Sequence, residues 1–382
     1  MRKNGLPVLM LAKLLRVFLY FVFLVVCVEV VLQGFYYFTT GDFLFRRVGI
    51  PIYAREPYAS YGNRPGLTFY HRTNEFHVWY YINRAGFRVP RPYLEYTLAK
   101  PSDTYRIMLL GSSFVFGWGV DYEVSLASVL DRLLEERRFA GVKKIEVINA
   151  GIPAMPEAPQ LTWFERAGKA YAPDLVIQFI NGSMAIPNVA APSAAVDDDG
   201  YLVPLGTDAF RRWRERFKNL ATVFYGWVLW TRLNTAPPQG PREPGGAVLG
   251  AGRETAAPTY FDPTVPRVRE AMLVYSKLAS IVHEMGARLA VVYFPDSYLI
   301  HTQDQSRWGY LRKGDSRRQM AFDAAFVRYL NECQIATIDI TPELQKSAQA
   351  GKRMYFWLDI HWTPAGNAVA AQAVADYLIH QP

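Results

Sequence analysis

The chain has 382 residues, of which 51% are hydrophobic by a broad count, 15% are aromatic and 20% are charged. This composition excludes a chain that is disordered throughout, and a mean hydropathy of −0.02 excludes a multi-pass membrane protein. A net charge of +8 fits an anionic membrane surface or a nucleic acid as a partner. Two cysteines are too few for a disulfide scaffold or a cysteine-rich metal site.

An apolar segment near the N-terminus predicts a membrane anchor. It runs from Val8 to Phe38 and contains the uncharged stretch Val17–Val28, with Lys13 and Arg16 before it and Glu29 after it. Roughly 20 apolar residues span a bilayer, and basic residues before the span keep the N-terminus in the cytoplasm. We therefore expect a single uncleaved helix in the inner membrane and a periplasmic main domain. With such an anchor, the positive charge indicates a membrane surface rather than nucleic acid.

Two alternatives would change the fate of this segment. A signal peptide is cleaved after small residues, and no A-x-A pattern follows the apolar core. A lipoprotein would be modified on Cys27, but Val26 stands where a small residue is expected. An uncleaved anchor fits the sequence better than either alternative.

The next segment, residues 41–102, is rich in Tyr, Arg, Pro and Asn and is expected to form a stalk. Within it, Asn74–Pro90 alternates polar and apolar residues in the way that is typical of a β-hairpin, with Asn83–Gly86 as the turn. The sequence thus predicts three parts, which are the cytoplasmic tip and anchor (1–40), the stalk and hairpin (41–102), and an α/β domain (103–382).

Strands and helices alternate within the third part. Strands are expected at 105–110, 144–150, 173–180, 287–294 and 336–340, and helices at 123–138, 156–171, 268–285, 319–333 and 365–379. Such alternation predicts right-handed βαβ crossovers and an α/β fold, a flavodoxin-like parallel sheet sandwiched by helices. In sheets of this kind, functional side chains gather beyond the carboxyl ends of the strands.

An insertion at about 186–266 interrupts the alternation. It holds a Gly-, Pro- and Ala-rich loop and an aromatic, basic helix candidate at 209–230. That helix suits the bilayer interface or a partner, and it equally suits a lid packed on the domain. The sequence leaves both interpretations open.

A serine follows the first strand of the α/β domain. In RIMLLGSSFVFG, the strand ends at Gly111, Ser112 and Ser113 come next, and Gly117 flanks them on the other side before a helix follows. Glycine permits a tight turn, and amides at a helix N-terminus can stabilise an oxyanion, so the segment suits a nucleophile. The alternative is an ordinary strand–helix turn with a serine cap.

A second constellation lies before the last helix. Asp359 and His361 are separated by one residue, and Thr363 is a candidate N-cap. A nucleophilic serine needs a base, and the base needs a carboxylate to orient it. We predict that Asp359 holds the Nδ1–H of His361 and leaves Nε2 toward Ser113. With no Walker loop, dinucleotide fingerprint or metal-ligand motif in the sequence, no cofactor and no metal are expected.

These residues resemble the conserved blocks of the SGNH (GDSL-like) hydrolase superfamily. Gly111, Ser113 and Gly117 match the first block, with Ser112 in place of its acid, and Gly151 in VINAGIPA matches the second. The form of the last block, DIHWTPAG, is similar to the alginate O-acetylation branch, and Gly-Ser-Ser is similar to the D-alanyl-transfer protein of teichoic acid modification. The resemblance implies an SGNH hydrolase fold.

The resemblance also implies residue roles. Ser113 would be the nucleophile, His361 the base and Asp359 its orienter, and the amides of Ser113 and Gly151 would stabilise the oxyanion. The superfamily's third block, Gly-x-Asn-Asp, is replaced here by NGSM.

This replacement affects the oxyanion site. It puts Asn181 on the glycine position and Ser183 on the asparagine position. Either Asn181 or Ser183 would then supply the third donor, or the site has decayed.

Two functions follow as expectations. The first is a membrane-anchored, extracytoplasmic serine esterase or O-acyltransferase that acts on an acetylated polysaccharide or another envelope glycan. The second is a catalytically degenerate domain that serves as a structural subunit beside other integral membrane proteins, for example in a respiratory, photosynthetic or export complex. The altered third block, the retained anchor and the aromatic insertion are the observations that motivate the second function.

Overall fold

The computed structural model describes residues 5–40, 43–44, 50–73, 75–141, 144–181, 194–204, 220–234, 266–301, 304, 316–357 and 359–380. The chain divides into two compact units. One comprises Met1–Gly49 and Gly206–Arg253, and the other comprises Ile50–Leu205 and Glu254–Pro382. The hairpin segment therefore groups with the α/β unit rather than forming a separate stalk, and most of the insertion groups with the anchor.

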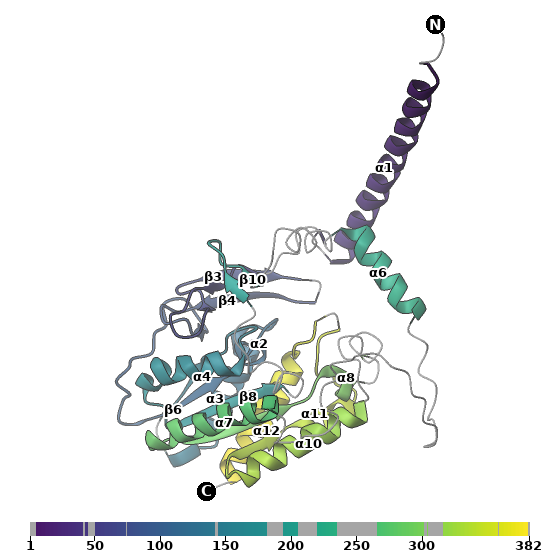
Figure 1. Cartoon of the computed structure of the whole chain (residues 1–382). Helices are drawn as coiled ribbons and strands as arrows, with labels where there is room; N and C mark the ends of the chain where they lie inside the picture. The colour runs from purple at the N-terminus through teal and green to yellow at the C-terminus, as the bar shows by residue number, and fades with distance from the viewer. Residues whose placement is uncertain are drawn as a thin grey trace, which may run out of the picture. The chain divides into compact units, whose positions relative to one another are not determined.

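The first unit contains the long N-terminal helix α1, Gly5–Thr40. Its segment Met10–Phe38 has 29 residues, and the most apolar 18-residue window within it has a mean hydropathy of 2.6 and no residue buried inside the protein. By length and composition, α1 fits either a membrane span or a signal sequence. A second helix, α6 at Ala221–Asn234, packs beside its end (Figure 1). The predicted insertion helix at 209–230 overlaps α6, whereas residues 209–219 lie outside the described residues.

An eight-stranded sheet forms the centre of the second unit, in the order β12-β11-β8-β6-β7-β5-β4-β3. Its strands are β3 Thr68–Arg72, β4 His77–Ile82, β5 Arg88–Val89, β6 Thr104–Leu110, β7 Lys144–Asn149, β8 Leu175–Asn181, β11 Arg288–Phe294 and β12 Ala336–Asp339. The strands from β12 to β7 are all parallel. Numbered along the chain, they have the 2-1-3-4-5 order of flavodoxin-like sheets, as predicted.

The hairpin extends this parallel sheet in the antiparallel direction. Strand β5 pairs with β7 through Arg88 and Asn149, and β4 and β3 follow outward. The predicted turn is confirmed, because the side-chain oxygen of Asn83 accepts hydrogen bonds from the amides of Ala85 at 3.1 Å and Phe87 at 2.9 Å. Two short strand pairs complete the β-structure: β1 Tyr53–Ala54 with β2 Gly62–Asn63, and β9 Ala194–Val196 with β10 Leu202–Pro204.

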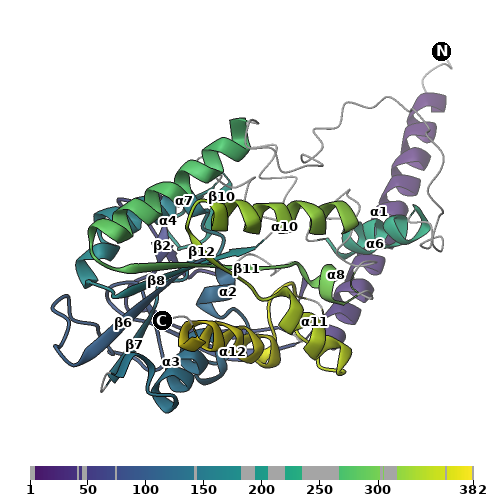
Figure 2. The same ribbon diagram turned by 90° about the horizontal axis from the view of Figure 1, so that it is seen from below.

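Helices cover both faces of the sheet, as the predicted sandwich requires (Figure 2). Along β6, Ile107 and Leu109 face one layer and Met108 and Leu110 face the other, because successive strand residues point to opposite sides. The first layer holds α3 Leu126–Glu136, α11 Thr341–Gln349 and α12 Pro364–His380, and the second holds α4 Glu157–Arg166, α7 Pro266–Glu284 and α10 Ser316–Glu332. The shorter helices are α2 Ser113–Phe116, η2 Tyr122–Val124, η3 Phe139–Gly141, η4 Gly168–Tyr171 and α8 Ser297–Ile300.

A buried arginine joins the hairpin to the segment after β6. The guanidinium of Arg88 is fully buried and donates hydrogen bonds to the carbonyls of Phe116 at 2.6 Å, Gly117 at 2.5 Å and Val120 at 2.6 Å. It also lies 4.8 Å from the centre of the Tyr80 ring. A buried charge is tolerated only when its donors are used, so this contact fixes the turn to the sheet.

Replacing this arginine tests that contact. Arg88→Met would leave three buried carbonyls without their donor, and we expect the free energy of unfolding to fall by about 3 kcal/mol. Arg84→Met, on an exposed side chain of the same hairpin, should change it by less than about 0.5 kcal/mol. Urea unfolding of the full chain in detergent, followed by tryptophan fluorescence, measures both. Equal stability of the two variants would contradict this role of Arg88.

Candidate active site

Ser113 lies at the tight turn between β6 and α2. It is the first residue of α2, and Gly117 ends that helix with a φ of 79°. A Cβ at Gly117 would lie 2.5 Å from Nη1 of Arg88, so the close approach of the arginine and the left-handed backbone both require glycine there. Gly151, just after β7, also packs closely, because a Cβ there would lie 2.3 Å from the amide nitrogen of Phe116.

Asp359 and His361 lie on a loop that is closed at its base. Tyr355 and Trp362 form a β-bridge, and the amide of Phe356 donates to the carbonyl of His361 at 2.9 Å. The predicted cap of the last helix is present, because Thr363 Oγ1 accepts the amide hydrogen of Gly366 at 3.2 Å. The loop is therefore tied down on both sides of the two side chains.

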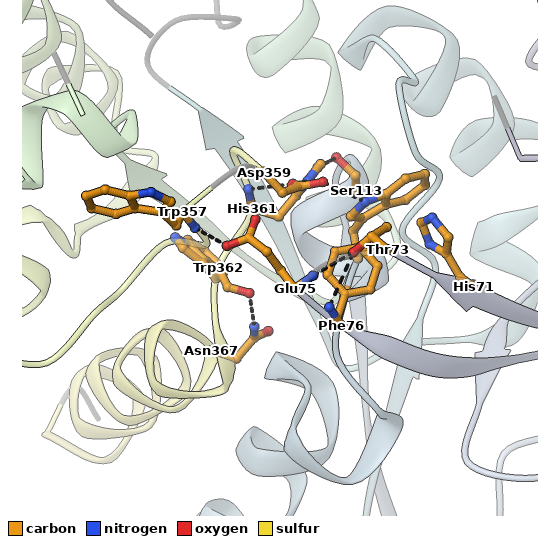
Figure 3. Close-up of polar contacts among 12 residues, drawn as sticks. His71, Thr73, Glu75, Phe76, Ser113, Trp357, Asp359, His361, Trp362 and Asn367 are labelled. Carbon is orange, nitrogen blue, oxygen red and sulfur yellow. Dashed lines mark hydrogen bonds and ion pairs between the residues drawn. The ribbon is translucent and has the colours of Figure 1, made fainter. Parts of the chain in front are cut away.

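The structure brings Ser113, His361 and Asp359 together in one hydrogen-bonded chain (Figure 3). Ser113 Oγ lies 2.5 Å from Nε2 of His361, and Nδ1 of the same ring contacts Oδ1 of Asp359. Since an ionised carboxylate can only accept, Nδ1 carries the proton and Nε2 is free to accept one from Ser113. This is the arrangement that the sequence predicts for the three residues.

The one-residue spacing between Asp359 and His361 has a structural reason. Oδ1 of Asp359 accepts the backbone N–H of His361 at 3.0 Å as well as the Nδ1–H of its ring. One oxygen atom thus holds both the main chain and the side chain of His361. The pair is fixed within a single turn of the loop.

Two aromatic rings enclose the imidazole of His361. The Phe114 ring centre lies 4.9 Å from it, and the Trp118 ring stacks on it at 5.5 Å with an interplanar angle of 30°. The indole Nε1–H of Trp118 also donates to Oδ2 of Asp359 at 3.3 Å. These contacts restrict rotation of the ring and occupy the second oxygen of the carboxylate.

The carboxyl of Asp359 is held in its ionised form. Burial raises its pKa, but the charge and hydrogen bonds of His361 and the hydrogen bond from Trp118 act in the opposite direction and prevail. The net result is a pKa below the ordinary value. Asp359 is therefore a carboxylate at neutral pH, as an orienting group must be.

The hairpin supplies one wall of this site, which the sequence did not indicate. The ring of His71 lies 4.9 Å from that of Trp118, and Phe76 lies 5.2 Å from Phe356. Glu75 accepts the amide hydrogen of Trp357 at 2.5 Å (Figure 3). Contacts of this kind join segments that are distant in the sequence, so no local sequence pattern predicts them.

His71 is a buried, neutral side chain beside Asp359 and His361. Tyr80 Oη accepts the amide hydrogen of Gly119 at 2.9 Å and lies 3.1 Å from Nδ1 of His71. The Tyr80 hydroxyl thus joins the ring of His71 to the backbone of the turn at Gly119. Burial is the main cause that lowers the pKa of His71 to about 4, aided by His361 and opposed by Asp359.

The predicted oxyanion donors have different surroundings. The Ser113 amide lies at the start of α2, whereas the Gly151 amide donates to Asn149 Oδ1 at 3.1 Å and would have to be shared to serve an oxyanion. Asn181 is the last residue of β8 and is 5% exposed. Ser183 lies outside the described residues. Across the described ranges, no group of three His, Cys, Asp or Glu side chains could hold a metal ion.

The pKa of His71 makes a prediction about stability. Its value of about 4 lies below the ordinary 6.5, so the unfolded chain takes up protons first as the pH falls. The wild type should therefore lose about 2 kcal/mol more free energy of unfolding between pH 7 and pH 5 than His71→Gln, which does not titrate. Urea unfolding at the two pH values measures this difference. Equal losses would show that His71 is not held neutral by the fold.

Comparisons with known proteins agree with this architecture. Residues 262–382 match the family model described as SGNH hydrolase-like domain, acetyltransferase AlgX. The match contains Asp359 and His361, whereas Ser113 lies outside it. No curated protein sequence matches the chain.

The solved structures to which the chain shows a distant similarity include esterases. A catalytic mutant of Axe2, an acetylxylan esterase from Geobacillus stearothermophilus, is 12% identical, with coverage of 72% of this chain and 94% of its own and a TM-score of 0.39. A putative lipolytic protein of the G-D-S-L family from Desulfitobacterium hafniense is 11% identical, with coverage of 71% and 98% and a TM-score of 0.38.

LAE5, an alpha/beta hydrolase from the metagenome of Lake Arreo in Spain, is 12% identical, with coverage of 74% of this chain and 99% of its own and a TM-score of 0.39. The family match covers the C-terminal third of the chain, and the parallel strand order agrees with an SGNH-like fold. Residues 262–382 are thus similar to the SGNH hydrolase-like domain of the AlgX acetyltransferase family.

Proposed function

We propose that this protein is a membrane-anchored, extracytoplasmic serine esterase or O-acyltransferase that acts on an acetylated polysaccharide or another envelope glycan. The observation that carries the proposal is the hydrogen-bonded chain from Ser113 Oγ through His361 to Asp359. Such a chain activates a serine, which is a weak nucleophile at neutral pH without an adjacent base.

The first half-reaction transfers an acyl group to the protein. Nε2 of His361 accepts the proton of Ser113 as Oγ attacks the ester carbonyl carbon. The tetrahedral intermediate then expels the alcohol, which takes the proton from Nε2. An acyl ester on Ser113 remains, and Asp359 stabilises the imidazolium while it exists.

The second half-reaction reverses these steps with a new acceptor. Water or a sugar hydroxyl gives its proton to Nε2 of His361 and attacks the acyl carbon. Ser113 then leaves with that proton. With water the products are a carboxylic acid and free enzyme, and with a sugar hydroxyl the product is a new ester. Esterase and acyltransferase activity therefore use the same residues and differ in the acceptor.

The proposed location rests on α1. A mostly apolar segment of 29 residues is long enough to cross a bilayer, and Arg2, Lys3, Lys13 and Arg16 precede or begin it. This charge distribution supports a cytoplasmic N-terminus and an α/β unit outside the inner membrane. The acetyltransferase named in the matching family model supports acetyl as the transferred group.

A structural role is the second candidate. It is favoured by the engaged amide of Gly151 and by the altered third block, since one oxyanion donor lowers the activation barrier by about 3–4 kcal/mol where it has been measured. In that case the protein would be a subunit of a larger membrane complex, and the triad would be a vestige.

Replacing the serine tests the catalytic role. The full chain in detergent should hydrolyse p-nitrophenyl acetate, and Ser113→Ala should reduce kcat/KM by about 1,000-fold or more, because no covalent intermediate can form. Ser112→Ala is the matched control, since Ser112 precedes α2 and makes no capping hydrogen bond with its side chain. Full turnover by Ser113→Ala would refute the mechanism. A folded but inactive wild type would favour the structural role.

The indole hydrogen bond makes a separate prediction. Trp118→Phe keeps an aromatic ring beside His361 but removes the donor to Asp359, so kcat for p-nitrophenyl acetate should fall by about tenfold. KM should change little, because the lost contact is to the orienting acid and not to substrate. Trp79→Phe, at an exposed tryptophan of the hairpin, should keep the wild-type kcat. An unchanged kcat in Trp118→Phe would show that this bond does not position Asp359.

A further inference from the structure

The insertion helix α6 is attached to α1 by a carboxylate. Oε1 of Glu29 accepts the amide hydrogen of Ala221 at 2.7 Å, and Oε2 accepts the amide of Thr222 at 2.9 Å and its hydroxyl at 2.8 Å. The first amides of a helix have no partner within it, and a negative charge there is favourable. Glu29 therefore caps α6 from a position 192 residues away in the sequence.

Further contacts hold the same faces together. Gln33, one helical turn after Glu29, donates to Oε1 of Glu29 at 2.7 Å and accepts the amide hydrogen of Leu44 at 2.9 Å. Beyond it, Tyr36 meets the Phe224 ring edge-on at 6.0 Å. Residues 29, 33 and 36 lie on one face of a helix. One face of α1 thus serves as a platform for α6 and for the start of the following loop.

The platform lies where α1 would leave the bilayer. Counting about 20 residues from Lys13 puts the outer edge of the hydrocarbon near Gln33. Glu29, the only acidic residue between Met10 and Phe38, would otherwise meet lipid without a partner, which is costly. The N-terminus of α6 satisfies this carboxylate at that depth.

Among the described side chains of α6, two apolar ones are exposed on one side of the helix. Val223 is 43% exposed and Leu229 is 58% exposed, and no described atom lies within 4 Å of a Cβ built on Gly226. At 100° per residue, positions 223, 226 and 229 span about 120° of the circumference of α6. Because α6 has 14 residues, it is about 21 Å long and too short to cross a bilayer.

We infer that α6 is a second membrane-contacting element, which lies in the outer interface of the bilayer with its apolar side toward the lipid. The inference rests on the anchoring of α1 proposed above. Lipid is the occupant that the structure favours, because α6 begins beside the C-terminal part of α1 (Figure 1), whose large apolar side chains are exposed as Val223 and Leu229 are. Short helices with one apolar side bind bilayers in this orientation.

Spin labels on α6 test the inference. Val223→Cys and Leu229→Cys would each be introduced into the full chain carrying Cys27→Ser and Cys333→Ser, labelled, and reconstituted in phosphatidylethanolamine and phosphatidylglycerol vesicles. Power saturation compares accessibility to oxygen, which enters lipid, with that to a nickel chelate, which remains in water. Oxygen accessibility should exceed nickel accessibility at both sites. Greater nickel accessibility, or protection from both reagents by a protein partner, would overturn the inference.

Two control labels separate this inference from the proposed anchoring. Phe23→Cys, in the middle of α1, should report lipid, and Asp198→Cys, on a side chain that is 99% exposed, should report water. If the Phe23→Cys label reports water, the anchoring itself is wrong. If it reports lipid while both α6 labels report water, only the inference about α6 is wrong. Hydrolysis of p-nitrophenyl acetate tests the catalytic proposal independently.

A further variant tests the attachment of α6 to α1 through Glu29. Glu29→Ala removes the cap of α6, so the ratio of oxygen to nickel accessibility at Leu229→Cys should fall at least twofold while Phe23→Cys is unchanged. Val28→Ala, at a neighbouring side chain that is 50% exposed, should leave both ratios unchanged. An unaltered ratio at Leu229→Cys in Glu29→Ala would show that Glu29 does not hold α6 at the interface.

Discussion

A buried cation holds the turn that carries the proposed nucleophile. Arg88 belongs to the antiparallel extension of the sheet, and its guanidinium donates hydrogen bonds to three main-chain carbonyls at and after the end of α2. Because a buried charge is stable only when it is hydrogen-bonded, the turn and the hairpin form one rigid piece. Trp118 lies within that turn and donates to Asp359. The position of Asp359 thus depends in part on the hydrogen bonds that Arg88 makes to the same turn.

The hairpin therefore has a chemical consequence as well as a structural one. It covers the site with His71, which stays neutral because burial lowers its pKa to about 4. A neutral imidazole beside the pair of Asp359 and His361 adds no positive charge that would oppose protonation of His361 during the reaction. The added strands thus build an aromatic wall beside Trp118 in which the imidazole of His71 carries no charge.

The sequence predicted the parts of this molecule that have local signals. Alternating strands and helices gave the flavodoxin-like sheet, and Ser113, Asp359 and His361 were identified because each follows a strand or precedes a helix in a recognisable block. Trp118 and Arg88 carried no such signal, because their partners are set by the packing of distant segments. Trp118 and Asp359 are 241 residues apart. The alternation in residues 74–90 revealed strands but could not reveal that they join the edge of β7.

The central claim is that Ser113 is an activated nucleophile, and a fluorophosphonate tests it most directly. Such a reagent forms a stable bond with a serine only when a base removes the hydroxyl proton. Intact-mass analysis of the treated full chain should show one adduct, which peptide mapping places on Ser113, and prior unfolding in urea should abolish it. A folded chain that forms no adduct, or forms one at another residue, would contradict the account.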